Sequence, residues 1–181
     1  MGLDMYLSRK TYVKNWSHMN KEERHATGVK LGGKKHPYID PKKISNIEEE
    51  MAYWRKANQI HKWFVDNVQN GVDDCGEYYV DADQLKELYD LCVEIKEFYA
   101  ANGDKGLAGF AEQRLPAQSG FFFGSTSYDT DENGYNYYMN DIKSTIKQLE
   151  PIFELQKKLQ ENKDNGIMNF DYPYYYYRSS W

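Results

Sequence analysis

The chain of 181 residues has a formal net charge of −5 and contains 40% hydrophobic, 28% charged and 16% aromatic residues. This length fits one domain of ordinary size, and the aromatic content excludes a chain that is disordered throughout. No apolar run approaches the roughly 20 residues of a membrane-spanning helix, no signal segment opens the chain, and two cysteines cannot form a disulfide framework.

The charge is distributed unevenly along the chain. Residues 1–43 hold ten Lys and Arg against four acids, a net charge of +6, so the remaining residues carry −11. Residues 14–43 also lack a clear periodicity and are rich in Gly and Pro, which predicts a long basic loop or flap on a single globular domain spanning 1–181. The flap is either a phosphate-binding patch or a solvated loop, and the acidic balance of the whole chain argues against duplex nucleic acid.

The N-terminal half of the chain opens with a strand pattern. Apolar and polar residues alternate over 3–13, which predicts a half-buried strand. Ser45 and Glu48 have the spacing of a capping box, and an apolar stripe follows them at helical spacing. The sequence therefore predicts a first helix from about 46 to 70, followed by a short strand over 77–80.

The C-terminal half adds two helices and two strands to the expected fold. A helix over 81–102 opens with a second capping box, and a Gly-rich loop over 103–117 follows it. A buried strand is expected over 119–125. A helix over 135–163, with a kink or break near Leu149 caused by Pro151, and a Tyr-rich strand over 167–177 complete the order. These elements predict an α+β domain, with an antiparallel sheet built from terminal and central strands and about three helices packed on it.

Several segments carry a family resemblance. They are the opening MGLDMYL, residues 53–58 with 60–61 and 63–65, residues 72–75, the QSGFFFGS segment at 118–125, and the final residues 179–181. In these segments the chain resembles small uncharacterised proteins carried by bacteriophages and prophages. The resemblance implies a phage origin and a location in the host bacterial cytoplasm, and it implies no catalytic residue.

A candidate ligand site lies on the predicted first helix. On a helical projection Trp54, Asn58 and His61 lie within about 60° of one another beside the apolar stripe, with Arg55 further round. A stacking face, two hydrogen-bonding groups and a guanidinium would suit an anionic, nucleotide-like molecule. The full set of predicted ligand-binding residues is Trp54, Arg55, Asn58, His61, Gln118, Ser119, Phe122 and Ser125. Alternatively, these polar side chains satisfy buried backbone groups and the Phe run is a core strand.

Metal and nucleophile patterns are weak. Residues 73–75 with His61 offer suitable ligand types but match no zinc spacing. Residues 129–134 begin like a calcium loop, yet the twelfth position is Asn140 rather than Glu, so a polar turn is the better interpretation. A dyad of Cys75 and His61 is the remaining nucleophile candidate. We therefore expect no metal and no cofactor, and assign no catalytic residue.

The sequence is compatible with three functions. The first is a phage-encoded protein that sequesters a small nucleotide-like signal of host immunity, as a counter-defence without turnover. The second is a phage inhibitor that binds a host protein directly, with the acidic body or the basic flap as its surface and the Tyr-rich terminal strand at an interface. The third is an unrecognised enzyme acting on nucleotides. A homo-oligomer is compatible with each of them, and no membrane partner is expected.

Overall fold

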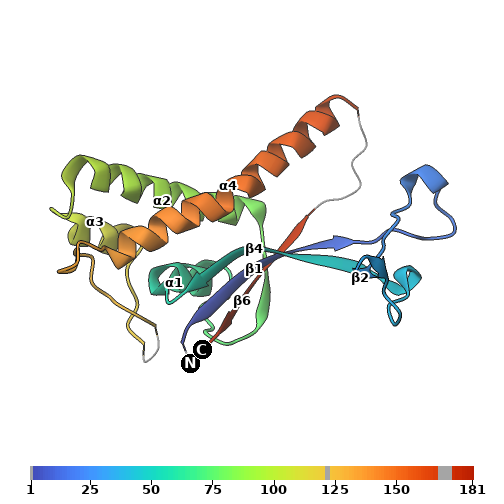
Figure 1. Ribbon diagram of the computed structural model, residues 1–181. Coiled ribbons are helices and arrows are strands. Elements are labelled where there is room, and N and C mark those ends of the chain that lie inside the picture. The colour runs from blue at the N-terminus through green and yellow to red at the C-terminus, as the bar shows by residue number, and fades with distance from the viewer. Residues whose placement is uncertain (1, 121–122, 167–172) are drawn as a thin grey trace.

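Four strands form one antiparallel sheet in the order β4-β1-β6-β5, and the helices gather on one side of it (Figure 1). The computed structural model describes residues 2–120, 123–166 and 173–181. The strands are β1 (Asp4–Tyr12), β4 (Asn46–Arg55), β5 (Glu77–Val80) and β6 (Tyr174–Ser180), and the helices are α1 (Asn58–Asn67), α2 (Ala82–Asn102), α3 (Leu107–Arg114) and α4 (Tyr137–Asp164). The expected α+β fold is confirmed.

The first and last strands lie side by side in the middle of the sheet. β1 pairs with β6 from Asp4 opposite Ser180 to Lys10 opposite Tyr174. The alternation expected of β1 is present, since Met5 and Leu7 are buried while the residues between them are partly exposed. The prediction that both terminal segments belong to one sheet is therefore confirmed. The terminal strand was expected over 167–177 and is found at Tyr174–Ser180, while residues 167–172 lie outside the described residues.

The predicted helix over 46–70 is wrong in its first half. Residues 46–55 form β4, which pairs along β1, and only residues 58–67 are helical. Pairing with β1 aligns the acidic side of β4 with a basic stretch: Arg9 lies opposite Glu49 and bonds it, and Lys10 lies opposite Glu48. This cross-strand complementarity and the burial of Trp54 outweigh the helical propensity of the Glu-rich segment.

Three further expectations need correction. The segment 103–117 contains α3, whose Leu107 and Ala111 are buried. No strand is present in the described part of 119–125, while Phe121 and Phe122 lie outside the described residues. α4 runs without a break through Pro151, which is exposed, so that water can satisfy the carbonyl left without a helical donor.

Local signals predicted α2 correctly. The Asp81 side chain accepts a hydrogen bond from the Asp83 backbone N–H, and the Gln84 side chain accepts one from the Asp81 N–H at 2.9 Å. These contacts satisfy backbone donors that the first helical turn leaves free. The helix ends at Gly103, whose φ of 61° suits a residue without a Cβ.

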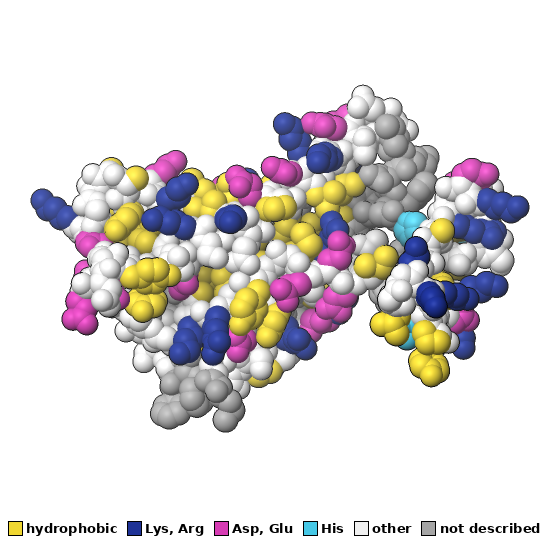
Figure 2. Space-filling view, viewed as in Figure 1, with side chains coloured by type: hydrophobic (Ala, Val, Ile, Leu, Met, Phe, Trp, Pro, Cys, Tyr) yellow, Lys and Arg dark blue, Asp and Glu magenta, His cyan; other side chains and the backbone are white. Residues whose placement is uncertain are grey.

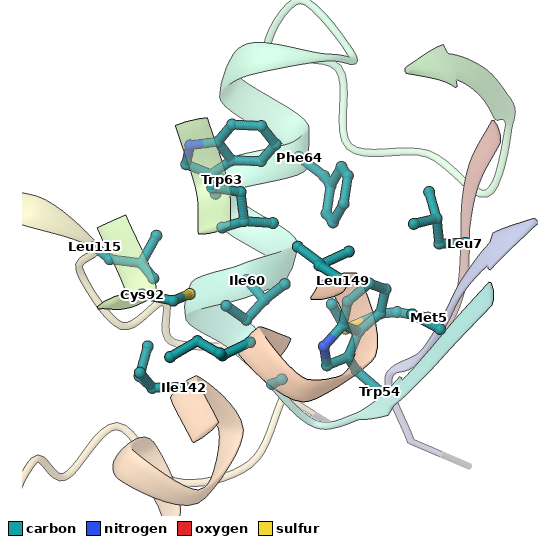
Figure 3. Packing of buried hydrophobic residues seen from close by; sticks show 14 of the residues in the cluster. Met5, Leu7, Trp54, Ile60, Trp63, Phe64, Cys92, Leu115, Ile142 and Leu149 are labelled. Atoms are coloured by element: carbon teal, nitrogen blue, oxygen red, sulfur yellow. The ribbon is translucent and has the colours of Figure 1, made fainter. Parts of the chain in front are cut away.

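The core fills the space between the sheet and helices α1, α2 and α4 (Figure 3). Met5 and Leu7 on β1 and Trp54 on β4 point toward Phe64 of α1 and Leu149 of α4. The Phe64 ring also stacks on Tyr177 of β6, with 3.9 Å between centroids. Burial of one such side chain contributes about 1.5–3 kcal/mol, so this shared core holds α1 against the sheet.

The residues between β1 and β4 form a separate projection, which we call the basic lobe (residues 14–43). It lies beyond the far ends of β1 and β4, away from α1–α3 (Figure 1). The Val13 N–H donates to the Ser45 carbonyl at 2.9 Å and closes its base. Within it lie the short turns η1 (Lys21–Glu23) and η2 (Pro41–Lys43) and the hairpin of β2 (Lys30–Leu31) with β3 (Lys34–Lys35).

None of the helices in the described ranges has the length and apolar character needed to cross a membrane.

Candidate functional site

The structure separates two residues that were predicted to share a helix. Trp54 and Arg55 are consecutive in β4, so they point to opposite faces of the sheet. Trp54 is 3% exposed, and its indole N–H donates to Thr145 Oγ1 at 2.9 Å. Arg55 is exposed on the other face, 3.9 Å from Asp4. Trp54 therefore contributes to the core and presents no ring face to solvent.

Asn58 anchors the loop that contains the other half of the predicted site. Its side chain is fully buried, and Nδ2 donates to the carbonyls of Phe123 at 3.0 Å and Ser125 at 2.8 Å. Its Oδ1 accepts a hydrogen bond from the Gln118 backbone N–H at 2.9 Å. The amide thus uses both donors and one acceptor on backbone groups, as the structural alternative predicts.

The loop residues themselves divide into three groups. The Gln118 side chain is half-buried, and its Oε1 lacks a hydrogen-bond partner among the described residues. Ser119 and Ser125 are exposed. Phe122 lies outside the described residues. The structure brings Asn58 and His61 to this loop, through Asn58 hydrogen bonds and an edge-to-face contact of His61 with Phe123, whose ring centroids lie 5.3 Å apart.

His61 lies fully buried between two polar partners. Nδ1 is 2.7 Å from the Tyr177 hydroxyl, and Nε2 is 3.0 Å from Asp73 Oδ1. Burial lowers the pKa of His61, against the opposing effect of Asp73, and burial raises the pKa of Tyr177 well above its usual value. A protonated Tyr177 therefore donates to Nδ1, and neutral His61 donates from Nε2 to Asp73.

The predicted dyad of Cys75 and His61 is not formed. The ring nitrogens of His61 bond Tyr177 and Asp73, and the Tyr177 hydroxyl belongs to a fully buried side chain whose pKa burial raises. Asp74 accepts from the Gly76 N–H and the Tyr78 hydroxyl, and Cys75 is exposed. Within the described ranges no three His, Cys, Asp or Glu side chains are grouped to hold a metal ion.

The calcium-like segment at 129–134 closes on itself. Asp131 Oδ1 accepts hydrogen bonds from the backbone N–H groups of Asn133 at 2.9 Å and Tyr135 at 2.8 Å. These are the contacts of a polar turn that leads into α4. The interpretation of this segment as a turn is confirmed.

The sheet face opposite the helices carries a surface that the sequence only partly revealed. We call it the tyrosine face: outward-pointing residues Tyr6, Tyr12, Tyr53, Tyr79, Tyr174 and Tyr176, which come from all four strands. The Tyr-rich terminal strand was predicted to divide between two faces, and Tyr175 and Tyr177 are indeed buried while Tyr174 is exposed. The tyrosines of β1, β4 and β5 belong to the same surface because the strand register places them next to the outward tyrosines of β6.

Rings of the tyrosine face contact one another across strands. Tyr6 and Tyr53 have centroids 5.3 Å apart, and Tyr79 lies 6.0 Å from Tyr176 and 6.4 Å from Tyr174. Cross-strand aromatic contacts of this kind stiffen a sheet and fix the orientation of each ring. The result is a pre-organised aromatic surface whose rings hold one another in place.

The charges on this face are largely balanced within it. Lys10 bonds Glu77 and also lies 4.5 Å from the Tyr176 ring centroid. Arg55 faces Asp4, and the Arg178 guanidinium covers the Tyr6 ring at 5.4 Å. A polyanion would have to compete with these internal partners, whereas an uncharged protein surface would not.

Comparison of the chain with protein families, with curated proteins and with solved structures finds no match.

Proposed function

We propose that this protein acts by binding another protein through the tyrosine face. The observation that carries the proposal is the set of outward tyrosines contributed by every strand of the sheet. Tyr12, Tyr53, Tyr79 and Tyr174 are between 39% and 56% exposed, although the sheet could have placed small polar residues there. Tyr is favoured in protein interfaces because it offers a large, stiff and amphipathic contact area.

The contacts of Asn58, His61 and Trp54 favour this function over a ligand groove beside α1. Each of these side chains is at least 97% buried and is hydrogen-bonded within the protein. A ligand would have to replace these contacts, at a cost that it could recover only partly. Their role in ligand binding stays a prediction, while their contacts support a structural role.

The resemblance to phage proteins suggests what kind of partner to expect. A phage protein in a bacterial cytoplasm meets host proteins, and an inhibitor needs only a complementary surface and no catalytic group. We therefore propose a host protein as the partner, with a contact surface rich in apolar and hydrogen-bonding groups and poor in charge.

The test compares two double variants, each of which replaces two exposed Tyr residues by Thr. Tyr79→Thr with Tyr174→Thr removes two rings of the tyrosine face and keeps the β-branched preference of the strands. Tyr38→Thr with Tyr137→Thr removes two exposed rings away from the sheet. Wild type and both variants are immobilised, exposed to bacterial lysate, and the captured protein is then purified and its Kd measured by titration calorimetry.

We expect the first variant to weaken binding at least 30-fold, which corresponds to about 2 kcal/mol for a typical central contact. The second variant should bind within twofold of wild type. Equal losses in both variants, or no captured protein, would contradict the proposal. Self-association of the wild type that is lost only in the first variant would identify a second copy as the occupant instead.

A further inference from the structure

The basic lobe concentrates positive charge at one end of an acidic protein. It contains eight Lys and Arg against three acids, a net charge of +5, so the remaining residues carry −10. Dark blue side chains accordingly gather on the lobe in Figure 2, whereas acids are spread over the body. Such a separation attracts anions to the lobe and directs them away from the tyrosine face.

A hollow of about 320 Å³ in the lobe collects several of these cations. It is lined by Asn15, Lys21, Arg24, His25, Ala26, Thr27, Pro41 and Lys42. Within the described residues neither Lys21 nor Lys42 forms an ion pair with an acid. The hollow therefore combines two ammonium groups that have no counter-charge with hydroxyl and amide groups. This combination is suited to binding a phosphate group.

Arg24 has a different task in this hollow. Its guanidinium donates to the carbonyls of Ser17 at 2.7 Å and Met19 at 2.9 Å. These bonds hold the segment 17–19 against η1, and thereby fix the shape of the hollow near Lys21. Arg24 is a positioning residue, and the lysines are the groups that can meet an anion.

A second hollow, of about 210 Å³, adds an aromatic surface. It is lined by Lys14, Trp16, His18, Met19 and Glu23, whose chain segments also contribute Asn15 and Arg24 to the first hollow. The Trp16 and His18 rings stack with centroids 5.8 Å apart and planes 9° apart, and Trp16 is 51% exposed. An exposed stacked pair can extend its stack by one nucleobase.

We propose that the basic lobe binds a nucleotide phosphate, with Lys21 and Lys42 at the phosphate and the Trp16–His18 pair as the stacking surface for a base. The same chemistry occurs in a free nucleotide and in single-stranded nucleic acid. The site is independent of the tyrosine face, and it places a nucleotide-like ligand at the opposite end of the sheet from Asn58 and His61.

The probes are ATP by titration calorimetry and a fluorescein-labelled 12-mer of oligothymidylate by anisotropy, both at 50 mM salt. The test variant is Lys21→Gln with Lys42→Gln. The matched control is Lys86→Gln with Lys96→Gln, which removes the same charge from two exposed positions on α2. Trp16→Ala and Trp16→Phe test stacking, and thermal unfolding of each variant confirms that it folds.

We expect the lobe variant to weaken binding at least tenfold and the control to stay within twofold. Trp16→Ala should weaken binding at least threefold, and Trp16→Phe should retain it. If ATP binds, a free nucleotide is sufficient as the ligand. If the oligonucleotide binds and ATP does not, the ligand is single-stranded nucleic acid. The proposal is overturned if neither probe binds, if both double variants weaken equally, or if a 12-base-pair duplex, whose bases are covered, binds as tightly as the single strand.

Discussion

Replacing Asn58 by Ala should destabilise the protein, because the side chain anchors the 118–125 loop. The substitution removes hydrogen bonds to the Phe123 and Ser125 carbonyls and from the Gln118 N–H, at a position with no exposed surface. At about 1 kcal/mol for each bond, the free energy of unfolding should fall by about 3 kcal/mol. For a domain of this size the Tm should fall by about 6–12 °C.

Calorimetric and chemical unfolding measure this loss, and hydrogen exchange locates it. We expect faster exchange at the Gln118 N–H and little change in α2. Asn140→Ala is the matched control, since Asn140 is exposed on α4 and its side chain forms no hydrogen bond with another described residue. The Tm of this variant should stay within about 2 °C of wild type.

Asn58→Asp sharpens the test. The carboxylate keeps an acceptor for Gln118 but replaces the NH2 group, which donates both other hydrogen bonds, by one oxygen that faces two carbonyl oxygens. Asn58→Asp should therefore be at least as destabilising as Ala at pH 7. If Asn58→Ala unfolds within 2 °C of wild type, the hydrogen bonds do not stabilise the loop. Asn58 would then be available for a ligand, as the sequence first indicated.

Two further predictions concern His61 and Gly124. Because burial lowers the folded-state pKa of His61 below its unfolded value of about 6.5, the unfolded state binds the proton more tightly, and stability should fall below pH 6.5 by up to about 1.4 kcal/mol per pH unit. In His61→Phe the free energy of unfolding, measured with urea between pH 7 and 5, should change less with pH than in wild type. An unchanged pH dependence would contradict the burial of a neutral ring. Gly124 has φ of 89°, and a Cβ there would lie 3.0 Å from the Lys56 carbonyl, so Gly124→Ala should cost at least about 1 kcal/mol. Gly109→Ala, in α3 with open space around its Cβ position, should instead stabilise by about 0.5–1 kcal/mol, and equal effects of the two changes would refute the strain argument.

The sequence predicted elements whose signals are local. Period-two alternation identified β1, and the Asp81–Gln84 capping box identified the start of α2. The prediction of a helix over residues 46–55 was wrong because Ser45 and Glu48 have the spacing of a helix start. The strand observed there is determined by pairing with a distant basic segment. The opposite charges of Arg9 and the Glu-rich stretch were visible in the sequence and could have indicated this pairing.

The candidate site was less predictable, because its contacts join residues far apart in the sequence. The helical period correctly placed Asn58 and His61 on one helix, but their partners, Ser125 and Tyr177, are more than sixty residues away. A single sequence offers no signal that such groups satisfy one another. The tyrosine face was predicted only in the terminal strand for the same reason, since its six rings come together only through the strand order.

The central position of β1 and β6 has a consequence for biosynthesis. β1 leaves the ribosome first among the sheet strands and β6 last, so the β1–β6 ladder cannot form until residue 180 has been made. Before that, β1 can pair only with β4, and the edge that β6 will occupy stays open, next to the apolar side chains of Met5 and Leu7. Pairing between such distant segments is slow, and an open strand edge promotes association with other chains. Slow synthesis or an early stop would therefore prolong an aggregation-prone state that the finished sheet does not have.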